Sequence, residues 1–263
     1  NNIVVNTLGN IDGVPSTYEG AKPKGNGIYF GNTKLNNITV ADNTCAGNNG
    51  AGIWVDHVKT SSGNRITGNT LYNNALCQIG FSDWSNNTSP PVNGSNAVPA
   101  YNDVVTDNVA HCLSAEQDSM FHINGHYTGV DFGTFSRNHY VDPFRANHFK
   151  RQAILLGGAM TPYTIQEWRS LTGDEMDSTV NGPLSSSAAD HTLVYNDQRV
   201  QQSIPIPSGT WGDALGNQYT GSVSLAPFAS KALYRVSTTT PPTITSVSVS
   251  AAALQLNEGS TAQ

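Results

Sequence analysis

The sequence predicts an all-β protein in which a solenoid of parallel strands is followed by a small antiparallel β-sandwich. Two observations support this prediction. An apolar residue, two variable residues and an asparagine recur five times in the first 140 residues, and the chain from Leu193 to Val236 alternates in short strands. Self-similarity at intervals of about 20 to 50 residues is typical of solenoids, in which each repeat stacks on its neighbours.

Each occurrence of the repeat continues with an inward-facing side chain two residues after the asparagine. The asparagines are Asn6, Asn43, Asn69, Asn108 and Asn138, and the side chains that follow are Leu8, Cys45, Leu71, Ala110 and Tyr140. The spacing ranges from 26 residues between Asn43 and Asn69 to 39 between Asn69 and Asn108, so each coil keeps its core while its loops vary. An asparagine at the same corner of every coil can donate to one neighbouring coil and accept from the other.

The repeats are rich in Thr, Val, Ile and Asn and are broken by Gly and by Asn-Asn or Asn-Gly pairs, which indicates short strands joined by tight turns. In these features they resemble the right-handed parallel β-helix of the pectate-lyase-like superfamily. The resemblance covers roughly residues 1–160. It implies the fold, and it leaves the chemistry open among polysaccharide lyases, glycoside hydrolases, epimerases and surface fibres.

A short helix is expected next, because Thr164 is a good capping residue, Glu167 follows it three residues later and Gly173 can end the helix. Residues 167–174 resemble the segment that closes the coil in many secreted bacterial β-helix proteins. The acidic residues at this point form either a cation-binding loop or a solvated turn. They are Asp174, Glu175 and Asp177.

The last third of the chain predicts further small units. The turn from Trp211 to Gly216 and the segment from Leu225 to Ser230 resemble the small antiparallel β-sandwich that ends many glycosidases. After Pro241 and Pro242, the final residues resemble the first strands of a bacterial immunoglobulin-like repeat. The predicted domains are the solenoid with its closing segment at 1–180, the sandwich at 181–237 and the linker with the immunoglobulin-like start at 238–263.

Composition narrows the function classes. The chain has 13 Lys and Arg against 19 Asp and Glu, which disfavours nucleic acid as a partner, and it has no apolar run long enough to span a membrane. A neutral, polar surface is typical of a secreted solenoid. Since the first repeat begins without a cap, we expect an export signal and further rungs upstream, and further domains downstream. No motif indicates a cofactor.

The sequence contains an odd number of cysteines. Cys45, Cys77 and Cys112 lie at different offsets from their asparagines, so no two share a stacking column. We expect buried free thiols in preference to a disulfide framework.

The outward face of the strand that follows each asparagine strand is the predicted site. Alternation places Ile28, Ile53, Ile79 and Phe121 inside. The outward and loop-edge positions then hold Tyr29, Trp54, Asp56, His57, Asp83, Trp84, His122 and His126. The longest loops, 83–102 and 124–134, leave from the same edge, which predicts a groove.

Asp56 and Asp83 are the candidate catalytic pair, because carboxylates one rung apart, about 5 Å between α-carbons, suit glycosidase chemistry. His122 is the third catalytic candidate, as acid, base or orienting group. The remaining side chains of the set would contact or stack on sugar rings. They are Tyr29, Trp54, His57, Trp84 and His126.

Each assignment has an alternative. The aspartates can cap turns, Trp54 can cover neighbouring side chains, and His57 with His126 can ligate a metal, although their spacing matches no known ligand motif. Lyase chemistry points to Lys59, or to Lys150 with Arg151, of which only Lys59 is expected near the groove. Glu116 and Asp118 are secondary candidates. The sequence therefore favours a secreted glycoside hydrolase or polysaccharide lyase, with a non-catalytic adhesive or glycan-binding solenoid as the second hypothesis.

Overall fold

The computed structural model describes residues 1–8, 25–30, 36–56, 61–82, 100–124, 132–153, 159–181 and 185–236. In these ranges the regular structure is almost entirely β-strand, and most strand pairs are parallel. The predicted all-β class is confirmed.

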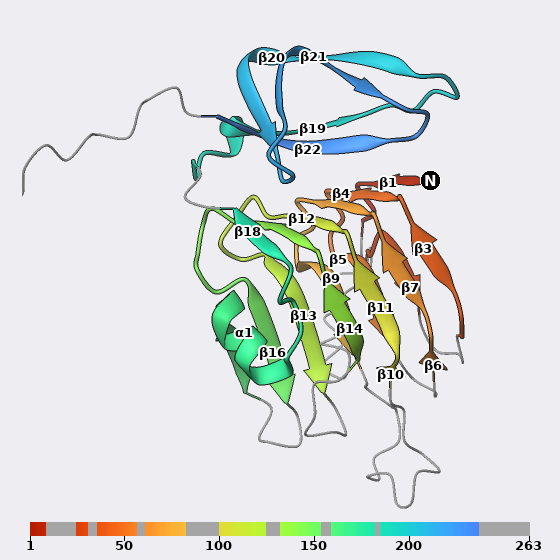
Figure 1. Cartoon of the computed structure of the whole chain (residues 1–263), viewed down its shortest axis with the longest axis vertical. Coiled ribbons are helices and arrows are strands. Elements are labelled where there is room, and N and C mark those ends of the chain that lie inside the picture. Colours follow the sequence, from red (N-terminus) through yellow and green to blue (C-terminus); the bar gives the residue numbers. More distant parts are fainter. Residues whose placement is uncertain are drawn as a thin grey trace, which may run out of the picture.

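Three sheets form the walls of a coil (Figure 1). The first sheet contains β3 (Thr39–Ala41), β7 (Arg65–Thr67), β11 (Asp103–Thr106) and β14 (Gly133–Ser136). The second sheet contains β1 (Ile3–Val5), β4 (Thr44–Ala46), β8 (Thr70–Tyr72), β12 (Val109–His111), β15 (His139–Val141) and β18 (Thr179–Asn181). The third sheet contains β2 (Ile28–Phe30), β5 (Ala51–Asp56), β9 (Cys77–Ser82), β13 (Asp118–Asn124), β16 (Phe149–Ala153) and the antiparallel β17 (Met160–Tyr163). A separate pair joins β6 (Ser61–Ser62) to β10 (Ala100–Tyr101).

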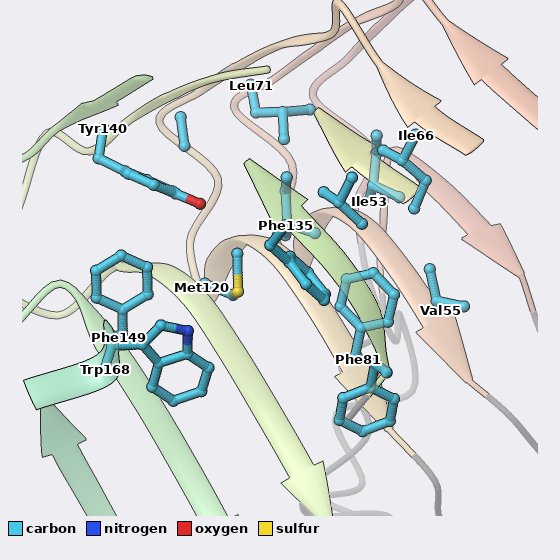
Figure 2. Packing of buried hydrophobic residues seen from close by; sticks show 14 of the residues in the cluster. Ile53, Val55, Ile66, Leu71, Phe81, Met120, Phe135, Tyr140, Phe149 and Trp168 are labelled. Carbon is cyan, nitrogen blue, oxygen red and sulfur yellow. The ribbon is translucent and has the colours of Figure 1, made fainter. Parts of the chain in front are cut away.

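The repeat sets the register of the first two sheets as predicted. The apolar residues that open the repeat are register partners in the first sheet, and the inward residues after the asparagine are partners in the second. The two buried columns are Val40, Ile66, Val105 and Phe135, and Cys45, Leu71, Ala110 and Tyr140. The core of the coil lies between them and the inner face of the third sheet (Figure 2).

The first repeat differs from its predicted register. Strand β1 pairs with β4 so that Val4 lies opposite Cys45, which makes Asn2, and not Asn6, the residue level with Asn43. Leu8, expected inside, is 79% exposed. The segment matches the repeat pattern by chance, because Ile3–Val5 belongs to the second sheet and not to the first.

The asparagines form the predicted hydrogen-bonded ladder at the corner between the first and second sheets. From Asn43 onward, each Oδ1 accepts both the backbone N–H and the Nδ2–H of the ladder residue one rung earlier, at 2.9–3.1 Å. The members are Asn2, Asn43, Asn69, Asn108 and Asn138. Two further ladders occupy the other corners, through Asn48, Asn74 and Gln78, and through Asn64 and Asp103. The sequence did not predict these two.

Strand β13 is shifted by one residue from its predicted register. Ile79 pairs with Met120, and Phe81 with His122, whereas alternation had placed Phe121 inside. The preceding turn is closed by Gln117, whose Oε1 accepts the Leu113 N–H at 2.7 Å, and it takes up one residue fewer than expected. Because strand side chains alternate, the shift exchanges the two faces of β13.

The expected helix is confirmed as α1 (Ile165–Thr172), with Thr164 and Glu167 forming a capping box and Gly173 left-handed at the C-terminal end. Its Trp168 is fully buried and stacks on Phe149, with ring centroids 5.4 Å apart (Figure 2). The helix thus packs against the last rungs of the core.

The C-terminal unit is one antiparallel sheet in the order β19 (His191–Tyr195), β22 (Ser230–Arg235), β20 (Gln202–Asp213) and β21 (Gln218–Leu225). Strand β20 breaks register between Pro205 and Thr210, and residues on either side of this break share one core cluster with Leu233. The sheet lies over the second sheet of the coil (Figure 1). The immunoglobulin-like start predicted at 238–263 lies outside the described residues.

Candidate functional site: the outer face of the third sheet

The predicted site corresponds to the face of the third sheet that points away from the coil core. Ile53 and Val55 of β5 belong to that core, and Trp54 between them belongs to a separate cluster. The outward column at this level is continuous across five strands. Its register partners are Tyr29, Trp54, Gly80, Phe121 and Lys150.

Trp54 is fully buried, so its prediction as an exposed platform for sugars is wrong. The indole lies across Gly80, where a Cβ atom would come within 2.0 Å of Trp54 Cε3. It also meets Phe121 edge to face at 6.1 Å between centroids. Tyr29, at the end of the column, is 44% exposed, as a sugar-contacting aromatic requires.

His122 does not belong to the outer face. The one-residue shift of β13 turns it into the core, where it is 1% exposed and lies 4.8 Å from the rings of both Phe132 and Trp168. Burial lowers the pKa of His122 to about 3, and neither ring nitrogen has a hydrogen-bond partner. A neutral imidazole enclosed by apolar rings cannot exchange protons with a substrate outside the coil, so its predicted exposure is wrong.

The paired carboxylates remain a prediction. Asp56 ends β5, and its register partner in β9 is Ser82, which directly precedes Asp83. The other loop-edge candidates, together with Asp83, lie outside the described residues. They are His57, Trp84 and His126, and Lys59 lies there too.

The structure assembles a charged cluster that the sequence did not predict. Lys150 continues the outward column, with Nζ 5.6 Å from the centroid of Phe121 and 2.6 Å from Asp118 Oδ2. Arg145 pairs with the other oxygen of Asp118 and also with the Gln117 carbonyl. Lys150 therefore lies on the outer face of the third sheet, whereas most of the loops predicted to form the groove lie outside the described residues.

A second carboxylate completes this cluster. Asp142 Oδ2 lies 3.5 Å from Arg145 Nε and 3.3 Å from His148 Nδ1. Both carboxylates are almost fully buried, whereas the Arg145 and Lys150 side chains are 21% and 22% exposed. A ligand can therefore reach the cations, while Asp118 and Asp142 hold them in place. The repeat pattern does not indicate this charged cluster, because Arg145 and His148 lie outside it.

The acidic segment after α1 is neither a cation loop nor a solvated turn at Glu175. This carboxylate is buried and accepts hydrogen bonds from Tyr140, Ser178 and Asn138, and so terminates the asparagine ladder. Burial raises the pKa of Glu175 above its usual value. Its role is structural.

The cysteines match their prediction, since Cys45, Cys77 and Cys112 are free and buried, and burial raises the pKa of each thiol. Across the described ranges, no three His, Cys, Asp or Glu side chains are grouped to hold a metal ion. The same ranges contain no helix of the length and apolarity needed to cross a membrane. Comparison with protein-family models, with curated proteins and with solved structures gives no match.

Proposed function

We propose that this protein is a secreted, carbohydrate-active protein that binds an extracellular polysaccharide along the outer face of the third sheet. The observation that carries the proposal is the outward column itself, which has the exposed ring of Tyr29 at one end and the reachable cations Lys150 and Arg145 at the other. Five strands span about 19 Å at the usual strand spacing. That length suits an oligosaccharide segment that contacts the two ends of the column, because Trp54, Gly80 and Phe121 between them are buried and do not contact it themselves.

The chemistry of the column fits a glycan. An aromatic ring stacks on the apolar face of a sugar, and ammonium or guanidinium groups donate to its hydroxyl or carboxylate oxygens. With Asp56 and Asp83 supplying acid and base, the bound chain would be cleaved, which makes the protein a glycoside hydrolase or polysaccharide lyase.

One observation favours the second candidate, a non-catalytic glycan-binding solenoid. The two described carboxylates of the charged cluster, Asp118 and Asp142, are buried and ion-paired. Their oxygens are engaged by Arg145, Lys150 and His148, so they are not available to a substrate as acid or base. The described part of the face thus offers binding groups, and catalysis depends on Asp56 and Asp83.

The test measures binding and turnover on a panel of plant, algal and bacterial polysaccharides. We expect Tyr29→Ala to weaken binding about tenfold or more, and Tyr195→Ala, which removes a 42% exposed tyrosine from the C-terminal sheet, to leave binding unchanged. Loss of product with retained binding in Asp56→Asn and Asp83→Asn supports the enzyme. Binding without product in the wild type supports the second candidate. Equal binding by Tyr29→Ala and the wild type would overturn the proposed face.

A further inference from the structure

The C-terminal sheet docks on the second sheet of the coil through a small mixed interface. Ala46 and Tyr72 of the coil pack with Ala232 of the C-terminal sheet, and Thr44 Oγ1 donates to Ser230 Oγ at 2.7 Å. The same interface contains two imidazoles in direct contact.

His111 on β12 and His191 on β19 face each other, with His111 Nε2 2.8 Å from His191 Nδ1. Both side chains are buried. A bond between two ring nitrogens requires one to donate and the other to accept. The tautomers of the two rings are therefore coupled when the sheet is docked.

The neighbouring backbone fixes the two tautomers. His191 Nε2 lies 2.7 Å from the carbonyl oxygen of Ser185, which can only accept, so Nε2 carries a proton. In a neutral His191, Nδ1 is then the acceptor, and the proton between the rings belongs to His111 Nε2. A neutral His111 consequently has an unprotonated Nδ1, which is buried and has no hydrogen-bond partner.

His111 cannot take up a further proton without loss. A proton on His111 Nδ1 would create a buried cation and a donor without an acceptor, beside the Tyr72 ring at 5.1 Å. Burial and the neighbouring His191 hold the pKa of His111 well below its usual value.

The other charged groups around the pair do not offset this cost at His111. Asp190, which precedes His191, already accepts from Arg235 Nε at 2.9 Å and from Ser185 Oγ at 2.6 Å. Tyr234 is the register partner of His191 on β22, and burial raises its pKa, which keeps it neutral. On the adjacent strand β15, His139 is bonded to Thr179.

We propose that His111, bonded to His191, is an acid-sensitive latch, which holds the C-terminal sheet on the coil while His111 is neutral and releases it when His111 takes up a proton. An undocked histidine titrates near pH 6.5, so the undocked form binds more protons below that pH. The equilibrium constant for docking is therefore highest above about pH 6.5. Below that pH it falls about tenfold per pH unit for one proton taken up on release.

A buried thiol introduced into the interface measures release directly, because it reacts only when the interface opens. Ala232→Cys on β22 provides the reporter, and Ala46→Cys on β4 provides a second one from the facing side. Labelling with 4,4′-dithiodipyridine, which reacts with thiols in acid, is followed by peptide mass spectrometry and corrected for the unfolded peptide. The native Cys45, fully buried in the coil, reports opening of the coil itself.

Between pH 6.5 and pH 5.0, protection of the interface thiol should fall about fifteenfold, while protection of Cys45 is unchanged. Adding His111→Gln, which keeps a donor near the Nε2 position and cannot titrate, should abolish the pH dependence. His191→Gln, which leaves His111 in place, and His139→Gln, which replaces a half-buried histidine on the adjacent strand, should both retain it. The latch is overturned if the pH dependence survives in His111→Gln, or if Cys45 loses protection in parallel.

Discussion

Removing one asparagine from the middle of the ladder should destabilise the coil far more than removing one from its end. In Asn69→Ala, the Oδ1 that accepts the Asn43 N–H and Nδ2–H disappears, together with the Nδ2 that donates to the Val40 carbonyl at 3.0 Å and to Asn108 Oδ1 at 2.9 Å. Three buried groups lose the partner seen in the structure. They are the backbone N–H of Asn43, its Nδ2 and the carbonyl of Val40.

The magnitude follows from those groups. A buried polar group without a partner costs about 1–3 kcal/mol, so three such groups give about 3–9 kcal/mol. The lower end allows for a water molecule in the vacated space. Asn2→Ala is the matched control, because it removes only the bond from Asn2 Nδ2 to Asn43 Oδ1 at an exposed position. Its cost should stay below about 1 kcal/mol.

Urea unfolding followed by circular dichroism measures both variants against the wild type. The expected result is a lower midpoint for Asn69→Ala and a nearly unchanged midpoint for Asn2→Ala, with similar slopes. Equal midpoints for the two variants would show that water replaces the hydrogen bonds of Asn69 equally well. That result would refute the reasoning.

Three further predictions concern the face, the ladder end and the thiols. Gly80→Ala should displace the Trp54 indole, shift its fluorescence and cost about 1–3 kcal/mol, because the new Cβ overlaps the ring; an unchanged emission spectrum would contradict this contact. Glu175→Gln should stabilise the protein relative to the wild type increasingly as pH rises above about 4.5. Because the pKa of Glu175 is raised in the folded protein, the stability that this carboxyl contributes is fully present below its unfolded pKa and is lost as the group ionises. A difference in unfolding free energy between variant and wild type that stays constant from pH 4 to pH 7 would contradict this prediction. A thiol reagent at pH 8 should label none of Cys45, Cys77 and Cys112 in the native protein and all three in urea; rapid native labelling of any one would disprove its burial.

The sequence predicts the fold well where one residue type marks the same corner of successive coils. Asn43, Asn69, Asn108 and Asn138 do so, because a carboxamide both donates and accepts and can therefore be repeated without limit along a stack. The other two ladders use mixed residues, such as Asn64 bonding to Asp103, and leave no recurring letter. They could not be found by looking for repetition.

The site was harder to predict than the fold because its residues follow turns of variable length. The turn before β13 is one residue shorter than predicted, so the register of β13 is shifted by one residue. His122 therefore points inward and Phe121 outward. The charged cluster brings Asp118 together with Arg145 and Lys150 from segments that the repeat does not describe. No pattern in the linear sequence predicts that contact, since it depends on which strands become neighbours.

The contrast between fold and site has a single physical cause. The ladder side chains form hydrogen bonds with the backbone groups at the corners of the coil. A loop between two strands can therefore lengthen without leaving a buried polar group unpaired. Loop length is therefore free to vary, as the intervals of 26, 39 and 30 residues between the ladder asparagines show. The same freedom decides which side chains reach the outer face, because an insertion of one residue in a turn exchanges inward and outward positions in the next strand. In a solenoid of this kind the strands and ladders specify the scaffold, and the turn lengths specify the surface on which function depends.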